Sequence, residues 1–195
     1  MNLGITATTN SFILNDNMNN KYRIFNPEVL YSKEALTTIN KPEIHNLTYL
    51  SSKNLRKRIR LCAHPNQNDS LHEMFIVHQR GAYVRPHKHI GKSESTHIIQ
   101  GLVDVVLFDN DGQIVNVINM GDYSSGKIFY YRMETPIFHT LIIRSKVLVF
   151  HETTNGPFDR STSFFAPWAP ADNDASNVVT FMSDLKNKIY GKKNA

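Results

Sequence analysis

Residues 81–101 read GAYVRPHKHIGKSESTHIIQG, and this stretch decides the fold. It places three histidines and a glutamate within eleven residues, and a glycine closes each end. If residues 82–89 form a β-strand, their side chains alternate between its two faces, so His87 and His89 point to the same side. Two imidazoles at positions i and i+2 of one strand lie close enough to bind a single ion.

Glu94 follows the short turn IGKS, which is rich in small and polar residues. It is therefore expected to begin the return strand and to face back toward the histidine pair. Gly81 and Gly101 provide the backbone freedom that the turns at the two ends need. His97 lies three residues after Glu94, so on a regular strand it faces the opposite side and is excluded as a ligand.

From residue 58 onward, runs of β-branched and aromatic residues recur with turn signals between them. The Asp-Gly pair in DNDGQ is a hairpin signal. Because no helical pattern separates the runs, they predict an all-β domain over residues 58–171, folded as an antiparallel sandwich or barrel. The runs are RIRLCAH (58–64), HEMFIVHQ (72–79), AYVRPHKH (82–89), STHIIQ (95–100), LVDVVLFD (102–109), QIVNVIN (113–119), KIFYY (127–131), HTLIIR (139–144) and KVLVFHE (146–152).

The segments on either side of this domain have a different character. Residues 1–20 are rich in Asn and Thr and are expected to form a flexible tail. Residues 21–57 predict an N-terminal arm with a short strand and one or two weak helical segments. Residues 172–195 should form a C-terminal amphipathic helix and tail, since apolar residues recur over 176–190 at steps of four, three and four. The proline-rich stretch SFFAPWAP at the end of the predicted all-β domain cannot be a central strand.

A metal site needs a further ligand from elsewhere in the chain. His139 shares its predicted strand face with Leu141 and Ile143, so it should point into the apolar interior. His151 shares a face with two valines in the same way and is the second choice. Neutral imidazoles together with one carboxylate suit a divalent transition metal such as Zn, Fe, Mn or Ni. Such a set leaves positions open for water or substrate, as catalytic sites do.

The stretch that opens this section fits the first cupin motif, G-x5-H-x-H-x3,4-E-x6-G, at every fixed position. The second cupin motif is matched poorly, because Pro136 and Ile143 stand where glycine and asparagine are usual. The flanks resemble the WbuC family of cupin-fold metalloproteins, which is associated with bacterial surface-polysaccharide gene clusters. This resemblance covers roughly residues 22–171 and implies a cupin jelly-roll barrel with a bound divalent metal. The pieces that carry it are RIRLCAHPNQNDSLHEM, YVRPHKHIGKSES, LFDNDGQI, FHTLI, HETTNGPF and FAPWAP.

Four further side chains are candidates for substrate contact or proton transfer. Arg60 and His64 share a strand face, and they are interpreted either as holding an anionic substrate at the barrel mouth or as part of a solvated edge strand. Tyr83 and Arg85 share the predicted strand face of His87 and His89, so both are expected to point inward. Arg85 would bind an anionic group or form a structural ion pair, while Tyr83 or His64 would move a proton.

Composition limits the remaining choices. The net charge of +5 suits a small anionic or sugar-like substrate as well as nucleic acid, and no helix-turn-helix pattern supports the latter. No run of apolar residues is long enough to cross a membrane. The single cysteine, Cys62, is interpreted as a small buried hydrophobic residue. No secretory signal is recognisable, so a cytoplasmic protein is expected, and the resemblance to cupins, which often pair through their outer strands, implies a homodimer.

Three classes of function follow from these observations. The first is a metal-dependent enzyme that isomerises, epimerises or eliminates on a sugar or sugar-nucleotide in surface-polysaccharide biosynthesis. The second is an Fe(II)-dependent dioxygenase, which the cupin resemblance implies because the same ligand set supports oxygen chemistry in other cupins. The third is a non-catalytic cupin that binds or senses a ligand. Fold alone does not separate them, because one scaffold supports many chemistries.

Overall fold

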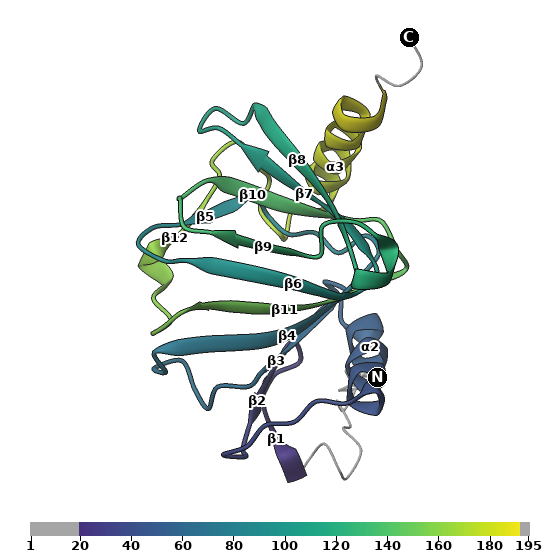
Figure 1. The fold of residues 1–195 in the computed structure, drawn as a ribbon. Coiled ribbons are helices and arrows are strands. Elements are labelled where there is room, and N and C mark those ends of the chain that lie inside the picture. Colours follow the sequence, from purple (N-terminus) through teal and green to yellow (C-terminus); the bar gives the residue numbers. More distant parts are fainter. Residues whose placement is uncertain (1–19, 192–195) are drawn as a thin grey trace, which may run out of the picture.

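The computed structural model describes residues 20–191, so the expected tail over residues 1–20 lies almost wholly outside the described part. Two β-sheets lie face to face, with α2 beside the lower sheet and α3 at the opposite end of the molecule (Figure 1). One sheet has seven strands in the order β1-β2-β3-β4-β11-β6-β9, and the other has five in the order β12-β5-β10-β7-β8. The strands are β1 (Tyr22–Asn26), β2 (Val29–Ser32), β3 (Arg58–Cys62), β4 (Leu71–Gln79), β5 (His87–His89), β6 (Glu94–Gln100), β7 (Leu102–Phe108), β8 (Ile114–Gly121), β9 (Tyr130–Met133), β10 (Phe138–Ile143), β11 (Val147–Asn155) and β12 (Ser163–Phe165). The helices are α2 (Lys41–Lys53), α3 (Ala175–Tyr190) and the short 3-10 turns η1 (Tyr123–Ser125) and η2 (Arg160–Thr162).

The strand order identifies the architecture. The eight strands β4 to β11 divide into two groups of four, β4-β11-β6-β9 in one sheet and β5-β10-β7-β8 in the other. Every pairing within these groups is antiparallel. Strands that switch sheets in this order form two Greek keys, which is the jelly-roll arrangement. The predicted all-β jelly-roll fold with a C-terminal helix is therefore confirmed, and its two sheets are hydrogen-bonded separately.

The interior between the sheets is built by simple alternation. In β6, Glu94, Thr96 and Ile98 are buried, whereas His97 between them is exposed. The same alternation buries apolar side chains of β7, β10 and β11 in one core that both sheets share. His97 thus lies outside the barrel, as the sequence predicts.

The strand expected over residues 82–89 is shorter than predicted. Only His87–His89 forms β5, and residues 82–86 have no regular structure. Pro86 explains the difference, because proline has no N–H to donate to a ladder and restricts the residue before it. The alternation that placed Tyr83 and Arg85 on the face of His87 therefore does not extend to these residues.

The strand expected over residues 127–131 is also displaced. The structure places β9 at Tyr130–Met133, where it pairs with β6. Ile128 instead forms an isolated β-bridge with Met120 of β8, since residues 126–127 belong to the turn that follows η1. This shift sets Tyr131 opposite Thr96, inside the barrel and near the start of β6.

The N-terminal arm is an extension of the larger sheet. It has two strands rather than one, and β2 pairs in parallel with β3. A capping box begins α2, since Asn40 and Glu43 exchange side-chain and backbone hydrogen bonds. Leu47 and Leu50 of α2 then pack in a core on the outer side of β3 and β4. The expected divisions at residues 20, 57 and 171 stay predictions.

Helix α3 covers the outer side of the five-stranded sheet. It begins at Ala175, one residue before the predicted span, and its buried Leu185 packs with Phe108, Phe138 and Trp168. The proline-rich stretch before it supplies only β12, at the edge of this sheet. Neither of the described helices is long and apolar enough to cross a membrane.

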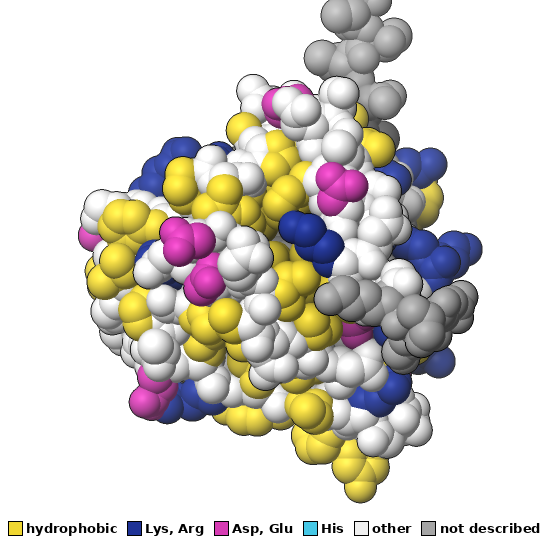
Figure 2. Space-filling view, turned by 90° about the horizontal axis from the view of Figure 1, so that it is seen from above, with side chains coloured by type: hydrophobic (Ala, Val, Ile, Leu, Met, Phe, Trp, Pro, Cys, Tyr) yellow, Lys and Arg dark blue, Asp and Glu magenta, His cyan; other side chains and the backbone are white. Residues whose placement is uncertain are grey.

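The surface seen from above carries a band of hydrophobic side chains through its middle (Figure 2). Most of its Lys and Arg side chains lie toward the two sides of this band. The expectation of a small ligand rather than nucleic acid stays a prediction.

The glycine at the end of β6 gives a test of the fold. Gly101 has φ +96°, and a Cβ there would lie 2.4 Å from the Val147 carbonyl oxygen. Gly91 also has a positive φ, +70°, but a Cβ there would meet nothing within 4 Å. We expect Gly101→Ala to lower the free energy of unfolding by more than about 2 kcal/mol and Gly91→Ala by about 1 kcal/mol, measured by urea denaturation. Equal losses of unfolding free energy in the two variants would contradict the close approach of the β11 backbone to Gly101.

Candidate functional site

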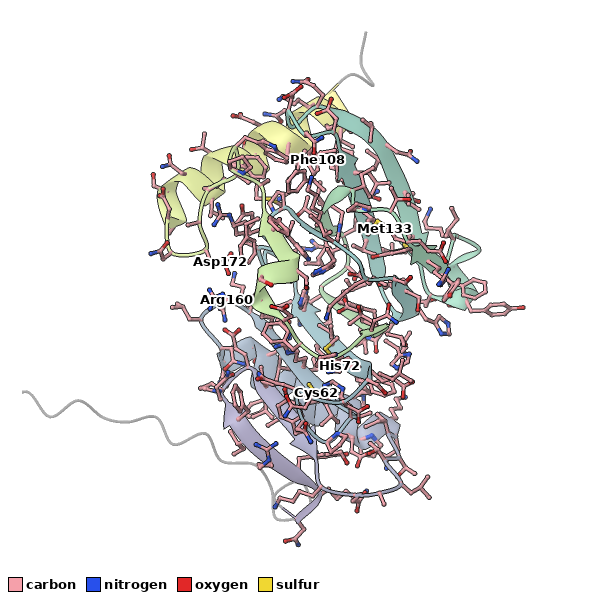
Figure 3. The ribbon with its side chains drawn as sticks, turned by 90° about the vertical axis from the view of Figure 1, so that its left-hand side faces the viewer. Cys62, His72, Phe108, Met133, Arg160 and Asp172 are labelled. Carbon is pink, nitrogen blue, oxygen red and sulfur yellow. The ribbon has the colours of Figure 1, made fainter. Side chains whose placement is uncertain are left out.

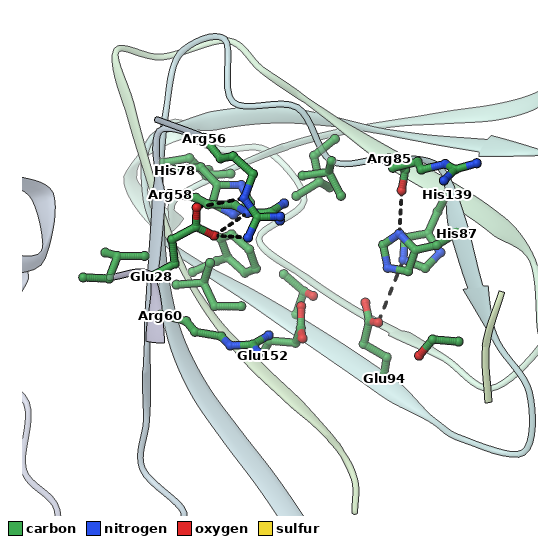
Figure 4. Close-up of a pocket in the computed structure, with 18 of the residues that line it drawn as sticks. Glu28, Arg56, Arg58, Arg60, His78, Arg85, His87, Glu94, His139 and Glu152 are labelled. Atoms are coloured by element: carbon green, nitrogen blue, oxygen red, sulfur yellow. Dashed lines mark hydrogen bonds and ion pairs between the residues drawn. The ribbon is translucent and has the colours of Figure 1, made fainter. Parts of the chain in front are cut away.

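A cavity of about 620 Å³ lies between the two sheets. Three of the four predicted metal ligands, His87, Glu94 and His139, line one side of it (Figure 4), and the fourth, His89, also lines the cavity. Arginine side chains from β3 lie on the other side. The apolar core described above forms part of the remaining wall.

The register of β5 against β10 brings two of the histidines together. His87 and His139 are direct partners in this antiparallel pair, and their ring centroids lie 4.5 Å apart. The His89 ring lies 5.0 Å from that of His87 and 6.2 Å from that of His139. Glu94 Oε2 lies 3.5 Å from His89 Nε2 and 3.9 Å from His139 Nε2. All four side chains therefore converge, although they come from three strands.

Backbone carbonyls hold two of the imidazoles in position. His87 Nδ1 lies 2.8 Å from the carbonyl oxygen of Arg85, and His139 Nδ1 lies 3.1 Å from that of Ile137. A carbonyl oxygen only accepts, so each Nδ1 carries the proton and donates it. The lone pair is then on Nε2, which is the arrangement of histidines that bind a metal.

Two hydroxyl groups support the other two ligands. Tyr131 donates a hydrogen bond of 2.9 Å to Glu94 Oε1, which leaves Oε2 directed at the histidines. Ser163 Oγ of β12 lies 3.1 Å from His89 Nδ1. Sequence reasoning missed both residues, because the contacts depend on how β9 and β12 align with strands far away in the chain.

The donor set fits a first-row transition metal, but the spacing is wider than a bound ion requires. Two ligand atoms on one such ion lie about 3.0–3.4 Å apart, given bond lengths near 2.1 Å. The distances from Glu94 Oε2 to His89 Nε2 and His139 Nε2 exceed this range, and within residues 20–191 no three His, Cys, Asp or Glu side chains stand at metal-binding positions. Metal binding would therefore require Glu94 Oε2 to lie closer to His89 Nε2 and His139 Nε2. The predicted ligand set stays a prediction.

Burial keeps the histidines neutral. Loss of hydration lowers the pKa of His87 to about 4, with a further contribution from the neighbouring His139 ring. Burial also lowers the pKa of His139 to about 4. The pKa of His89 is lowered by burial and then by His87. At neutral pH the three rings therefore retain lone pairs.

Glu152 of β11 also lines the cavity, and sequence reasoning did not select it. It shares a strand face with Leu148 and Phe150, two apolar residues, and this alternation was the signal that could have found it. Burial and the nearby Glu94 carboxylate raise the pKa of Glu152 to about 8, while Arg60 lowers it. His151 points to the outer face, where it contacts Phe75 and lies 3.8 Å from Glu73, so it is excluded as a ligand.

The predicted substrate residues are divided between different places. Arg60 and Arg85 line the main cavity, as expected. Tyr83 does not: its hydroxyl donates to the Pro170 carbonyl and its ring packs against Phe181 of α3. The expectation that Tyr83 points into the barrel is wrong, because the chain before Pro86 is not a strand.

His64 lies in a second, smaller cavity of about 100 Å³. Its ring stacks on that of His72, with centroids 4.1 Å apart. Cys62 and His72, which come from β3 and β4, lie close together on this side of the molecule (Figure 3). The small cavity shares five lining residues with the main one, so the two spaces adjoin. The shared residues are Arg60, His89, Glu152, Phe158 and Ser163.

Comparison with known proteins gives little about the reaction. Residues 39–120 match a family described as a domain of unknown function, DUF6016. No curated protein matches the chain. Among solved structures, oxalate decarboxylase from Lactobacillus farciminis is 15% identical, with a TM-score of 0.40 over 50% of this chain. The Bacillus subtilis enzyme is 17% identical, with a TM-score of 0.41 over 50% of this chain.

The chain spans only 27% and 24% of the lengths of these two decarboxylases. A Shewanella oneidensis protein is 8% identical, with a TM-score of 0.43 over 53% of this chain and 66% of its own.

The buried imidazoles predict how stability depends on pH. In metal-free protein, the free energy of unfolding should fall as pH drops from about 6.5 to about 4. In this range His87 and His139 are protonated in the unfolded chain but remain neutral in the folded protein. Above that range both states are neutral at these rings, so their contribution is constant. Urea denaturation at several pH values measures the slope, which is at most about 1.4 kcal/mol per pH unit for each histidine.

His139→Gln should flatten this fall, and the substitution of the exposed His97 by Gln serves as the matched control. The same slope in wild type and His139→Gln would show that the buried ring does not control the pH dependence.

Proposed function

We propose that the protein binds one divalent transition metal through His87, His89, Glu94 and His139. The observation that supports this is that the possible ligand atoms face one another. Nδ1 of His87 and of His139 donates a hydrogen bond to a backbone carbonyl, which leaves Nε2 free. Nε2 of His89 and Nε2 of His139 face the same Glu94 oxygen. A partly buried group of three imidazoles and one carboxylate that converge on one side of a cavity is typical of a metal centre with open positions.

We infer that the reaction is an isomerisation, epimerisation or elimination on a sugar or sugar-nucleotide. A bound divalent cation would polarise a carbonyl oxygen of the substrate and acidify the neighbouring C–H group. The cavity of about 620 Å³ is large enough for such a molecule. The resemblance to WbuC proteins supports a role in surface-polysaccharide biosynthesis, in a cytoplasmic and dimeric protein.

The side chains around the proposed centre have separate roles. Tyr131 fixes the Glu94 carboxylate through its hydrogen bond. Arg60 and Arg85 would bind anionic parts of the substrate from the cavity wall. His64 remains the proton-transfer candidate, since burial lowers its pKa and leaves it neutral, and it faces a space that adjoins the main cavity.

Metal binding can be tested without knowing the substrate. Protein loaded with Mn²⁺, Fe²⁺, Ni²⁺ or Zn²⁺ and then desalted should retain one ion per chain by elemental analysis. Glu94→Gln should weaken affinity by more than about 100-fold, and Tyr131→Phe by about 10-fold through loss of orientation. His97→Gln is the matched control and should bind as wild type does. Absence of a stoichiometric ion in the wild type would refute the proposed centre.

Turnover is tested with a panel of sugar phosphates and nucleotide sugars, followed by NMR in deuterated water. A substrate should exchange a C–H proton or change its spectrum with the metal-loaded wild type, and Glu94→Ala should lower the rate by about 100-fold or more. Oxygen uptake with Fe²⁺, without any sugar conversion, would favour a dioxygenase over the proposed reaction.

A further inference from the structure

We propose that Arg60 and Glu152 form a subsite for a carboxylate group of the ligand, where the main cavity meets the smaller one. The inference deepens the proposed function and rests on it for the position of the ligand in the cavity. It assigns the substrate to acidic sugars, such as a uronic acid, rather than to neutral sugars. Both side chains line both cavities.

The neighbouring arginines already have partners. Arg56 lies 2.6 Å from Glu28 and 3.0 Å from Asp172. Arg58 contacts the same two carboxylates, at 3.2 and 3.3 Å. These two guanidinium groups are neutralised by the protein and are poorly suited to bind a further anion.

Two other arginines also line the cavity, and each has some of its guanidinium atoms bound or hydrated. Arg85 donates to the Ala166 carbonyl at 3.3 Å and lies over the Phe165 ring. Arg160 is exposed on η2, where water can hydrate its charge. Arg85 Nε is also buried without a hydrogen-bond partner, but Arg85 Nη2 is already bound to the Ala166 carbonyl, whereas no atom of the Arg60 side chain hydrogen-bonds to residues 20–191.

Arg60 differs from these residues. Its Nε is buried and has no hydrogen-bond partner, and within residues 20–191 no carboxylate lies within ion-pair distance of it. A guanidinium group that is partly removed from water without a counter-charge is costly, so the position favours an anion from the ligand. Figure 4 shows the Arg60 side chain extending toward Glu152 across the floor of the cavity.

Glu152 completes the subsite as a hydrogen-bond donor. Its carboxyl group makes no hydrogen bond to any described residue, and it lies on β11 beside the strand that carries Glu94. Burial and the Glu94 charge favour its neutral form at neutral pH, with Arg60 opposing them. A neutral carboxyl can donate its O–H to a ligand oxygen while the guanidinium supplies the charge.

The charge of the pair selects the kind of anion. One guanidinium and one neutral acid carry a total charge of +1, which balances a single carboxylate. A phosphate monoester carries a charge close to −2 at neutral pH, and the nearby Glu94 would repel the excess. A carboxylate is therefore favoured over a phosphate at this position.

The test uses the full-length, metal-free protein and isothermal titration with D-glucuronate, D-glucose and D-glucose 6-phosphate. Wild type should bind glucuronate at least about tenfold more tightly than either of the other two probes. Arg60→Gln should lose at least about tenfold in glucuronate affinity, while Arg160→Gln, the matched control from the same cavity, should stay within about threefold. Glu152→Gln keeps a donor and should also stay within about threefold, whereas Glu152→Ala should lose about tenfold.

Glucuronate binding that is no tighter than glucose binding, or that is unchanged in Arg60→Gln, would overturn the assignment. Tighter binding of the phosphate probe would overturn the choice of carboxylate. Thermal unfolding of each variant confirms folding, and Arg60→Lys, which keeps the charge, should recover part of the affinity. Because no metal is present, a failure of the metal centre would leave this result unaffected.

Discussion

The pairing of His87 with His139 across β5 and β10 is the contact on which the site depends. Strand β5 has only three residues, because Pro86 stops it on one side and Gly91 follows soon after. A short strand that is paired with both β10 and β12 cannot change register without turning His87 and His89 out of the cavity. The jelly-roll order is what brings these distant strands together, since β10 lies about fifty residues further along the chain.

Around this pairing, polar side chains point into the cavity, and their atoms that face away from it form hydrogen bonds with other parts of the protein. Backbone carbonyls bind Nδ1 of His87 and His139, and the Tyr131 hydroxyl binds one oxygen of Glu94. The atoms left free are those that face the cavity. Side chains held in this way need little reordering to bind a ligand, which lowers the free-energy cost of binding.

Much of this arrangement could be predicted from the sequence, because it follows from alternation along single strands. The i, i+2 spacing placed His87 and His89 on one face, the turn returned Glu94 to them, and the apolar face of its strand pointed His139 inward. The prediction for Tyr83 was wrong, because it extended the alternation of strand faces past Pro86, where the strand stops. Tyr131, Ser163 and the partners of Arg58 depend on pairing between distant strands, which no local pattern contains. Glu152 had a local signal, but its strand is apolar on both faces, so alternation alone did not decide between it and His151.

The most direct test of the account is anomalous X-ray diffraction from crystals grown with excess Mn²⁺ or Zn²⁺. The account predicts one strong anomalous peak per chain between β5, β6 and β10, within bonding distance of the three imidazoles and the Glu94 carboxylate. A map without a peak there, or with these four side chains pointing apart, would contradict it.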